Sequence, residues 1–301
     1  MSSNNPKRHH YVPQFYLRRF ACFNDINKVA TIERHNDFLI ADRKSINHTG
    51  YEVGLHDYVD EGRATSIEGS LNRMIETPLA SSSTWRKICN GACATLNEQD
   101  KLPIYVFARH LQLRNLETLR FIETESTLMQ AERNGAHLSK EELDMHRWIA
   151  ATPNGARVLF YEGAIDTMLP SDANQINVMV CRSPIVLRSS TNPTLVISYP
   201  GEQSIFGSFF DSLRTWWLTL DRYWGAFIVA GGPSSFTNTT MPLDAARVIN
   251  RRYLIQLQNS LSVRYLIADD KYVEEDLEWT GYRFEQRTTH GFRYRKVASE
   301  R

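Results

Sequence analysis

The sequence has few cysteines and no long apolar run, and its charges almost cancel. Its 301 residues include four cysteines, of which only Cys89 and Cys93 are close in sequence. No second pair or nearby histidine completes a zinc-binding set, so we expect reduced thiols in the core. Nothing approaches the roughly 18 apolar residues of a membrane span, and no secretory signal follows the basic N-terminus. These absences favour a cytoplasmic protein.

The common catalytic motifs are also missing. The sequence contains no GxxxxGK[ST] phosphate loop, no GxGxxG dinucleotide fingerprint, no GxSxG elbow and no HExxH zinc motif. These absences exclude the common P-loop ATPases, Rossmann dehydrogenases, α/β hydrolases and zinc proteases. No cofactor is indicated by a motif.

Charge is uneven along the chain although its net value is only +1. The first 20 residues hold Lys7, Arg8, Arg18 and Arg19 with no acid, and residues 281–301 hold six basic and two acidic side chains. If the two ends meet in the fold, they form a basic surface suited to nucleic acid. The alternative is two solvated ends.

Hydrophobic periodicity predicts an α+β fold with a central helical layer, a mostly antiparallel sheet, and strands in both the N-terminal and C-terminal parts. Short strands are expected over 28–60, at 178–180, 185–187 and 195–197, over 216–230 and at 263–267. Helices are expected from Ser66 to a break or kink at Pro78, over 98–132, 139–151 and 154–169, and near 243–260. We expect one domain over 1–301, with a boundary near residue 170 as the alternative.

His9 and His10 stand side by side in the dense basic-aromatic segment KRHHYVPQFYLRRF, and Gln14 follows. Histidine is suited to general-base and metal-ligand roles near neutral pH. Adjacent side chains diverge, so one site that uses both histidines needs an irregular backbone, which Pro13 favours. The alternative is one core histidine and one surface histidine.

Glu68 and Glu76 lie eight residues apart in the helix predicted to begin near Ser66. At this spacing they fall about two turns apart on nearly the same side of the helix. Glu68 is a candidate metal ligand or general base. Its alternative role is that of an acid that stabilises the positive end of the helix dipole.

On the helix that begins near residue 98, His110, Arg114 and Glu117 form one polar stripe, whereas Arg109 and Gln112 share another side. An arginine can clamp a phosphate or a carboxylate, and a glutamine can orient a water or a base. An exposed network of pairs along the helix is the competing interpretation.

Two further features carry weaker signals. Residues 189–193 (SSTNP) place hydroxyl groups and the Asn192 amide in a turn, where they can bind an anion or only form the turn. Trp216 and Trp217 could stack on bases, but their spacing is more typical of a hydrophobic core.

Five blocks together resemble a known bacterial family of unknown function, DUF4238, whose members begin with a His-His-Tyr-Val-Pro-Gln signature. The blocks are HHYVPQFYLRRF, Ile67-Glu68, Gln112 with Arg114, the Ser-Thr-Asn-Pro turn and Ile249-Asn250. They cover roughly residues 7 to 268. The resemblance implies a common fold and a shared polar cluster, and it supplies no reaction. In this family the turn usually reads Ser-Asp-Asn-Pro, so Thr191 stands where an aspartate would be.

The leading hypothesis is a phosphodiester hydrolase, specifically a nuclease. His10 is then the general base or the ligand of a divalent metal ion, Glu68 its carboxylate partner, Gln112 the residue that orients water, and Arg114 the phosphate clamp. The substrate-binding residues are His9, Gln14, Arg114 and Asn192. The basic block at 7–19 attracts nucleic-acid phosphates. This hypothesis requires the N-terminal block to pack against both polar helices.

Two alternatives stay open. One is a non-catalytic module that binds protein or nucleic acid and whose polar cluster is a buried structural network. The other is an enzyme that acts on a nucleotide or another small molecule. An open cleft at the cluster favours an enzyme, full burial favours a structural network, and a narrow pocket favours a small ligand.

Overall fold

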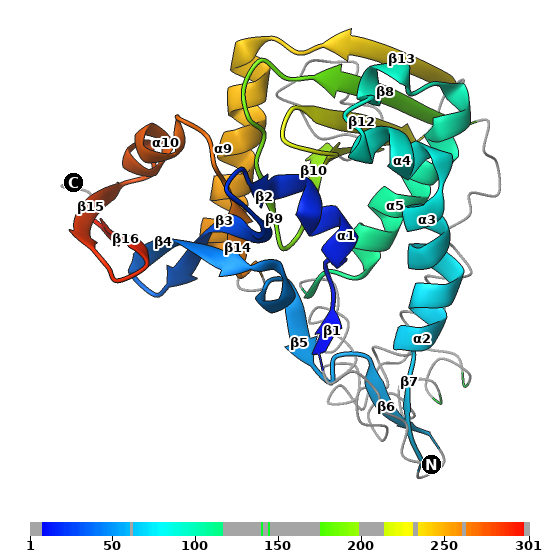
Figure 1. Ribbon diagram of the computed structural model, residues 1–301, viewed down its shortest axis with the longest axis horizontal. Coiled ribbons are helices and arrows are strands. Elements are labelled where there is room, and N and C mark those ends of the chain that lie inside the picture. The colour runs from blue at the N-terminus through cyan, green and yellow to red at the C-terminus, as the bar shows by residue number, and fades with distance from the viewer. Residues whose placement is uncertain are drawn as a thin grey trace.

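The computed structural model describes residues 8–60, 63–116, 140, 144, 175–198, 214–230, 234–260 and 263–297. The chain has the predicted α+β fold: its strands form a seven-stranded sheet, a five-stranded sheet and two two-stranded sheets, and helices pack beside them (Figure 1). The helices predicted over 139–151 and 154–169 lie outside the described residues, apart from Lys140 and Asp144. The alternative boundary near residue 170 lies outside them too.

The seven-stranded sheet joins the two ends of the chain. Its order is β15 (Tyr282–Arg287), β16 (Gly291–Lys296), β4 (Phe38–Ser45), β3 (Asp25–His35), β14 (Tyr265–Ile267) and β9 (Ser189–Ser190), and β2 (Ala21–Cys22) also pairs with β3. All these pairings are antiparallel. Asn36, at φ 45°, forms the tight turn between β3 and β4, since asparagine tolerates this left-handed conformation.

The five-stranded sheet has buried residues on both faces of its inner strands, whereas its edge strand β13 (Ser235–Thr240) is mostly exposed. The order of this sheet is β10 (Thr194–Ser198), β11 (Arg214–Thr219), β12 (Trp224–Ala230), β8 (Ile176–Arg182) and β13, and only β13 pairs in parallel, with β8. Successive residues of a strand point to opposite faces. Trp216 therefore packs in the hydrophobic cluster of the helices α4 (Ser83–Cys89) and α5 (Lys101–Leu113), and Trp217 packs in the cluster around α9 (Leu243–Asn259). With 2% and 0% exposure, both are core residues.

The strand predicted at 185–187 is absent, and these residues form an irregular loop. Its backbone donors bond to another loop instead of a strand: the N–H groups of Ser183 and Leu187 donate to the carbonyls of Tyr223 and Arg222, both at 2.7 Å. Pro184 lacks an N–H group and cannot donate to a ladder, which explains why the apolar run does not extend one.

The helix that carries Glu68 continues through Pro78, so Pro78 does not end it, which was one of the two predicted outcomes. It consists of α2 (Glu68–Leu71), the π-helical turn η3 (Asn72–Glu76) and α3 (Thr77–Ser81). Pro78 lies in the first turn of α3, where a missing N–H group is tolerated, because the π-turn before it has already changed the hydrogen-bond register. Ser66 assists the start of α2 by accepting the Glu68 N–H at 3.3 Å.

The long helix predicted over 98–132 ends earlier in the structure. It comprises η5 (Glu98–Asp100) and α5 (Lys101–Leu113), and the predicted part beyond residue 116 lies outside the described residues. Asn115 explains the end of α5, since its side-chain amide donates to the Gln112 carbonyl at 2.5 Å. An asparagine that binds a terminal carbonyl in this way competes with continuation of the helix.

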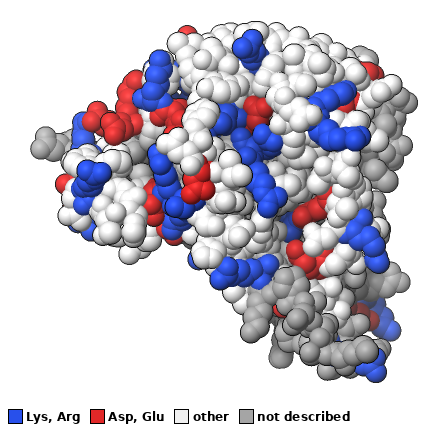
Figure 2. All heavy atoms as spheres, in the orientation of Figure 1, with Lys and Arg blue, Asp and Glu red and all other residues white. Residues whose placement is uncertain are grey.

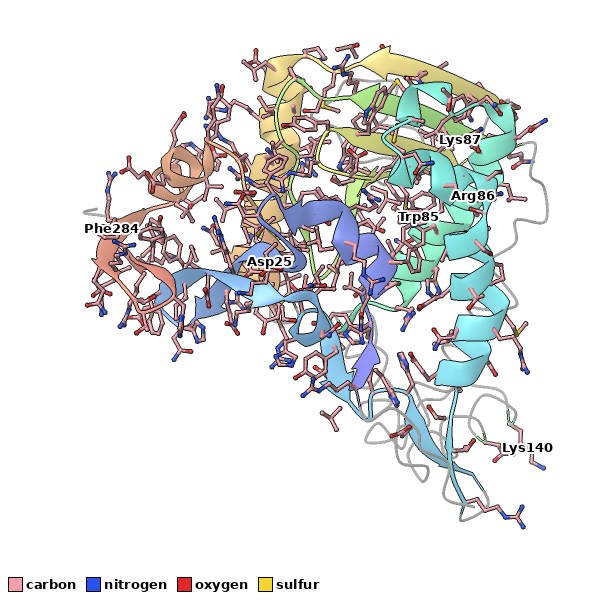
Figure 3. The ribbon with its side chains drawn as sticks, in the orientation of Figure 1. Asp25, Trp85, Arg86, Lys87, Lys140 and Phe284 are labelled. Atoms are coloured by element: carbon pink, nitrogen blue, oxygen red, sulfur yellow. The ribbon has the colours of Figure 1, made fainter. Side chains whose placement is uncertain are left out.

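Aromatic rings fasten the N-terminal segment to the helices. The strand β1 (Arg8–His10) pairs with β5 (Tyr51–Val53), and α1 (Gln14–Leu17) and η1 (Arg18–Phe20) follow it. Trp85 of α4 (Ser83–Cys89) lies 4.9 Å from the Phe15 ring and 5.1 Å from the Phe107 ring (Figure 3). This contact holds β1 beside α5, which places the adjacent histidines.

The remaining described elements are short. They are η2 (Ile46–His48), β6 (Asp57–Asp60), β7 (Arg63–Ser66), η4 (Cys93–Thr95) and α10 (Val273–Trp279). Cys22, Cys93 and Cys181 are buried thiols as expected, but Cys89 is exposed at the end of α4. Within the described ranges, every helix is too short or too polar to cross a lipid bilayer.

The two basic ends of the chain do not meet. The strand β1 pairs with β5, whereas β16 pairs with β4, and the hairpin of β15 and β16 lies at the side of the molecule away from β1 (Figure 1). A common basic surface of both ends, considered from the sequence, is therefore not formed by the described residues. The N-terminal strand packs against β5, and the C-terminal hairpin packs against β4.

Candidate functional site

Arg114 is the centre of a buried polar cluster that joins three segments of the chain. Its side chain has 0% exposure. One guanidinium nitrogen, Nη2, donates to the His10 carbonyl and lies 3.9 Å from Glu68 Oε2. The other, Nη1, pairs with the Glu76 carboxylate and lies 3.0 Å from His110 Nε2. The predicted packing of the N-terminal block against both helices is present.

His56, from the loop between β5 and β6, completes the cluster. Its Nδ1 hydrogen-bonds the Glu68 carboxylate, and its ring stacks on His9 with centroids 5.1 Å apart. The backbone N–H of His56 donates to His9 Nδ1 at 2.9 Å, and Asn72 donates to Glu68 Oε1 at 3.2 Å. His9 Nε2 lies 3.6 Å from Asp57 Oδ1. Glu68 is thus held by its neighbours in one orientation.

Burial sets the protonation states in the cluster. It lowers the pKa of His56 and of His110 to about 3, because water-free surroundings disfavour the imidazolium ion. Burial alone raises the pKa of Glu68, but the hydrogen bond from His56 and the charge of Arg114 outweigh it and hold the pKa at about 2. At neutral pH the cluster therefore combines neutral imidazoles, an ionised Glu68 and a guanidinium.

His10 lies at the edge of this cluster and is only partly buried. Burial lowers its pKa, the charge of Glu68 counteracts this effect, and that of Arg114 adds to it. His10 Nε2 lies 3.2 Å from the amide nitrogen of Gln14, and its ring centroid lies 5.7 Å from that of Tyr51. A neutral imidazole at the edge of a buried network is suited to accept a proton.

Tyr51 connects His10 to an open groove of about 420 Å³. The groove is lined by His48, Tyr51, Glu52, Val53, Arg264 and Tyr265. Arg8 lies over the Tyr51 ring, with its guanidinium carbon 5.3 Å from the centroid, so the basic N-terminal block reaches this groove. Arg8, His48 and Arg264 are exposed. The groove therefore offers cations and aromatic rings beside His10.

Three of the residues expected in the site take other positions or roles. Arg114 cannot clamp a substrate phosphate as expected, because it is fully buried and its two terminal nitrogens are engaged by protein groups. Gln112 lies about 200° around the helix from His110 and accepts a hydrogen bond from Arg109 at 2.5 Å. Asn192 is buried, and its backbone N–H and carbonyl both bond the Ser190 hydroxyl.

Thr191, which stands where the family resemblance led us to expect an aspartate, is a structural acceptor. Its Oγ1 accepts the backbone N–H groups of Arg264 at 3.0 Å and Tyr265 at 3.2 Å. These two residues line the groove beside His10. A carboxylate can accept the same two N–H groups, so either residue type can hold β14 in this place. The turn therefore affects the site by holding β14, and with it the groove residues Arg264 and Tyr265, in place.

A second buried polar network ties the loop before β9 to α9 and α10. Arg188 has 0% exposure and pairs with Asp270 at 2.6 Å and Asp276 at 2.9 Å. The Asn250 side chain accepts the Arg188 N–H at 2.8 Å and donates to the Val186 carbonyl at 2.9 Å. These contacts explain the Ile249-Asn250 block as architecture, since they replace a strand ladder with side-chain hydrogen bonds.

Sequence reasoning missed His56 and Tyr51. His56 stands in a loop without periodicity, and its signal is the nearby Gly54, whose φ of 65° turns the chain so that Leu55 and His56 are buried. Acidic atoms are visible in the region between the N-terminal segment and the α2–α3 helix (Figure 2). The side chains of Glu68 and Glu76 are only 13% and 14% exposed. Among the described residues, no three His, Cys, Asp or Glu side chains are arranged to hold a metal ion.

Comparison with known proteins gives one match. A family described as "Protein of unknown function (DUF4238)" matches residues 8–182, which is more than half of the chain. This range contains every residue of the polar cluster around Arg114. No curated protein and no solved structure matches the chain.

Proposed function

Because the chain belongs to the DUF4238 family, whose description names no activity, we propose a function from the site itself: hydrolysis of phosphodiester bonds in nucleic acid. The observation that carries the proposal is the position of His10. It is a neutral imidazole between a buried, charged network and an open groove with exposed cations. General-base catalysis needs a proton acceptor held in this way beside a substrate site.

The reaction assigns one role to each part of the site. His10 takes a proton from water as the water oxygen forms a bond to phosphorus and the bond to the leaving oxygen breaks. The proton then passes to the leaving oxygen, giving a phosphate monoester and an alcohol. Arg264 and Arg8, which face the groove or lie at its edge, attract the phosphate charge.

The buried residues act by positioning. Arg114 binds the His10 carbonyl and so fixes β1, and its two carboxylate partners fix Arg114 in turn. His56 holds Glu68, whose negative charge stabilises the protonated form of His10 during the reaction. Neutral His10 is present over a wide pH range because its pKa lies below 6.5.

A cleavage assay tests the proposal. Single- and double-stranded DNA and RNA are incubated with the parent chain, with His10→Ala and with the control His35→Ala, in Mg²⁺, Mn²⁺ or chelator. His35 is a suitable control because it stacks on Phe38 at the far end of β3. Loss of the base lowers the rate by about 10²–10⁴-fold in His10→Ala, and His35→Ala keeps the parent rate. Equal rates in all three proteins, or no cleavage by the folded parent, refute the hydrolase.

The second candidate function is a non-catalytic binding module. The complete burial of His9, His110 and Arg114 favours it, since a buried and connected polar network can serve only to fix a fold. For a binding module, His10→Ala changes the thermal midpoint of the protein, but there is no reaction rate for it to change. A folded parent that binds nucleic acid and cleaves none of the four substrates supports this candidate.

A further inference from the structure

A second and larger groove, of about 680 Å³, lies between the sheet strands β3 and β4 and the turn that joins β15 to β16. Its floor is apolar: Ile32 and Ala41 are partners in register, and Val273 and Phe292 line its sides. Gly291 allows β16 to approach β4, because a Cβ atom there would collide with the Ala41 carbonyl oxygen. Main-chain contact thus fixes the turn against the sheet.

Basic side chains from separate segments line this groove. Lys28 comes from β3, Arg43 from β4, Arg287 from the end of β15 and His290 from the turn, and all four are exposed. The one acid in the lining is Asp42, and its carboxylate accepts the backbone N–H of Arg43 at 2.6 Å. The groove therefore carries a positive charge although the whole chain is nearly neutral.

The arginines of the groove differ from their neighbours in having no acidic partner. On the same hairpin, Arg283 and Arg293 each pair with a glutamate, at 3.1 Å and 2.8 Å. Within the described part of the chain, Arg43 and Arg287 form no ion pair. Lys28 lies 3.5 Å from Asp25, an exposed pair that water screens, so all three cations of this concave surface are available to an external anion.

We infer that this groove binds single-stranded nucleic acid, with phosphates on Lys28, Arg43 and Arg287 and a base on the Phe292 ring. Cations from three strands fit successive phosphates of a polymer better than one small anion. Phe292 is 44% exposed and faces the same groove, and unpaired bases stack on such rings. The inference extends the proposed function and rests on it for the choice of nucleic acid over another polyanion.

The hairpin itself supplies a matched control. Arg283 and Arg287 lie on the same strand and carry the same charge, but only Arg287 lines the groove. The Phe284 side of the hairpin lies away from the rest of the molecule (Figure 3). Replacement of either arginine by alanine therefore removes one positive charge from the protein, but only Arg287→Ala removes a charge from the groove.

Binding is measured by fluorescence anisotropy with labelled single-stranded and duplex DNA and RNA of about 12 nucleotides, at several salt concentrations. All variants are made in the His10→Ala background so that cleavage cannot consume the probe. Each phosphate contact contributes about 0.7 to the salt slope for a single strand, so Arg287→Ala or Arg43→Ala weakens binding about fivefold in 0.1 M salt. Arg283→Ala leaves affinity and slope unchanged, and Phe292→Ala weakens single-strand binding about fivefold or more.

Three results overturn the inference: no binding of single strands at low salt, an equal loss in Arg283→Ala and Arg287→Ala, or full affinity in Phe292→Ala. The experiment separates this inference from the proposed function. If binding depends on Arg287 but the parent cleaves no substrate, the groove does bind nucleic acid and the proposed hydrolase function is refuted. If cleavage depends on His10 but Arg287→Ala binds with full affinity, the hydrolase function stands and the proposed binding role of the groove is refuted.

Discussion

Replacement of Arg114 by methionine tests whether the buried cluster holds the site together. The substitution keeps an apolar stem of similar length but removes the charge that Glu76, Glu68 and the His10 carbonyl share. Because Arg114 has 0% exposure, water cannot replace it at these groups. Removing one member of a buried ion pair costs about 3–5 kcal/mol of unfolding free energy. In a chain of 301 residues, whose unfolding entropy is about 0.6 kcal/mol/K, this corresponds to a fall in Tm of roughly 5–8 °C.

Urea unfolding followed by circular dichroism measures this cost. Arg86→Met is the control, because Arg86 is exposed on α4 and a surface substitution changes stability by about 0.5 kcal/mol or less. The second substitution Glu76→Gln, made together with Arg114→Met, removes the carboxylate left unpaired and recovers about 0.5–3 kcal/mol. A loss below about 1 kcal/mol in Arg114→Met, equal to that of Arg86→Met, refutes the role assigned to the cluster.

Three further predictions concern pH, the turn and the backbone. The pKa values of His56 and His110, lowered to about 3 by burial, mean that from about pH 6.5 downward the unfolded chain binds protons that the folded chain does not. The free energy of unfolding therefore falls with decreasing pH, by up to about 1.4 kcal/mol per pH unit for each histidine, and a flat urea titration between about pH 7 and 5 contradicts this. Thr191→Val removes the acceptor of two backbone N–H groups and costs about 1–3 kcal/mol, whereas Thr191→Asp keeps the parent Tm; equal Tm values for the two variants contradict the structural role. Gly50 has φ 69° and a Cβ there would lie 2.8 Å from Val12 Cβ, so Gly50→Ala lowers stability by about 1–3 kcal/mol, and an unchanged thermal midpoint is the contrary result.

The same buried polar cluster is compatible with both candidate functions for a physical reason. Charged and polar side chains that are buried together stabilise one another and specify a unique packing, whether or not a reaction follows. The site differs from a purely structural network at one point, His10, which is partly exposed and contacts Tyr51, a residue that lines the groove. The cleavage rate of His10→Ala therefore distinguishes the two candidate functions, and the stability of Arg114→Met tests whether the cluster holds the fold together.

Local patterns in the sequence determined much of the fold. Loose alternation located β3, β-rich apolar runs located β8 and the region of β11 and β12, and helical spacing located α5 and α9; the α+β class followed from their order. The C-terminal hairpin escaped this reasoning because it is covered on little of its surface: Tyr282 is the one buried residue of β15 and Tyr294 the one of β16. Aromatic residues do alternate with charged ones in both strands, but Phe284 and Phe292 are exposed, so this alternation does not mark a buried face.

The sequence by itself also named His10, Glu68 and Arg114 as residues of one polar cluster, from residue types and helical spacing. Only the tertiary structure decided their roles, because burial, and not residue type, determines whether an arginine clamps a ligand or a carbonyl. It also added His56, whose loop carries no periodic signal, and it paired Gln112 with Arg109, on the side of α5 that the helical spacing gives both residues. Contacts between residues over a hundred positions apart depend on the packing of whole elements, and a local pattern does not contain that information.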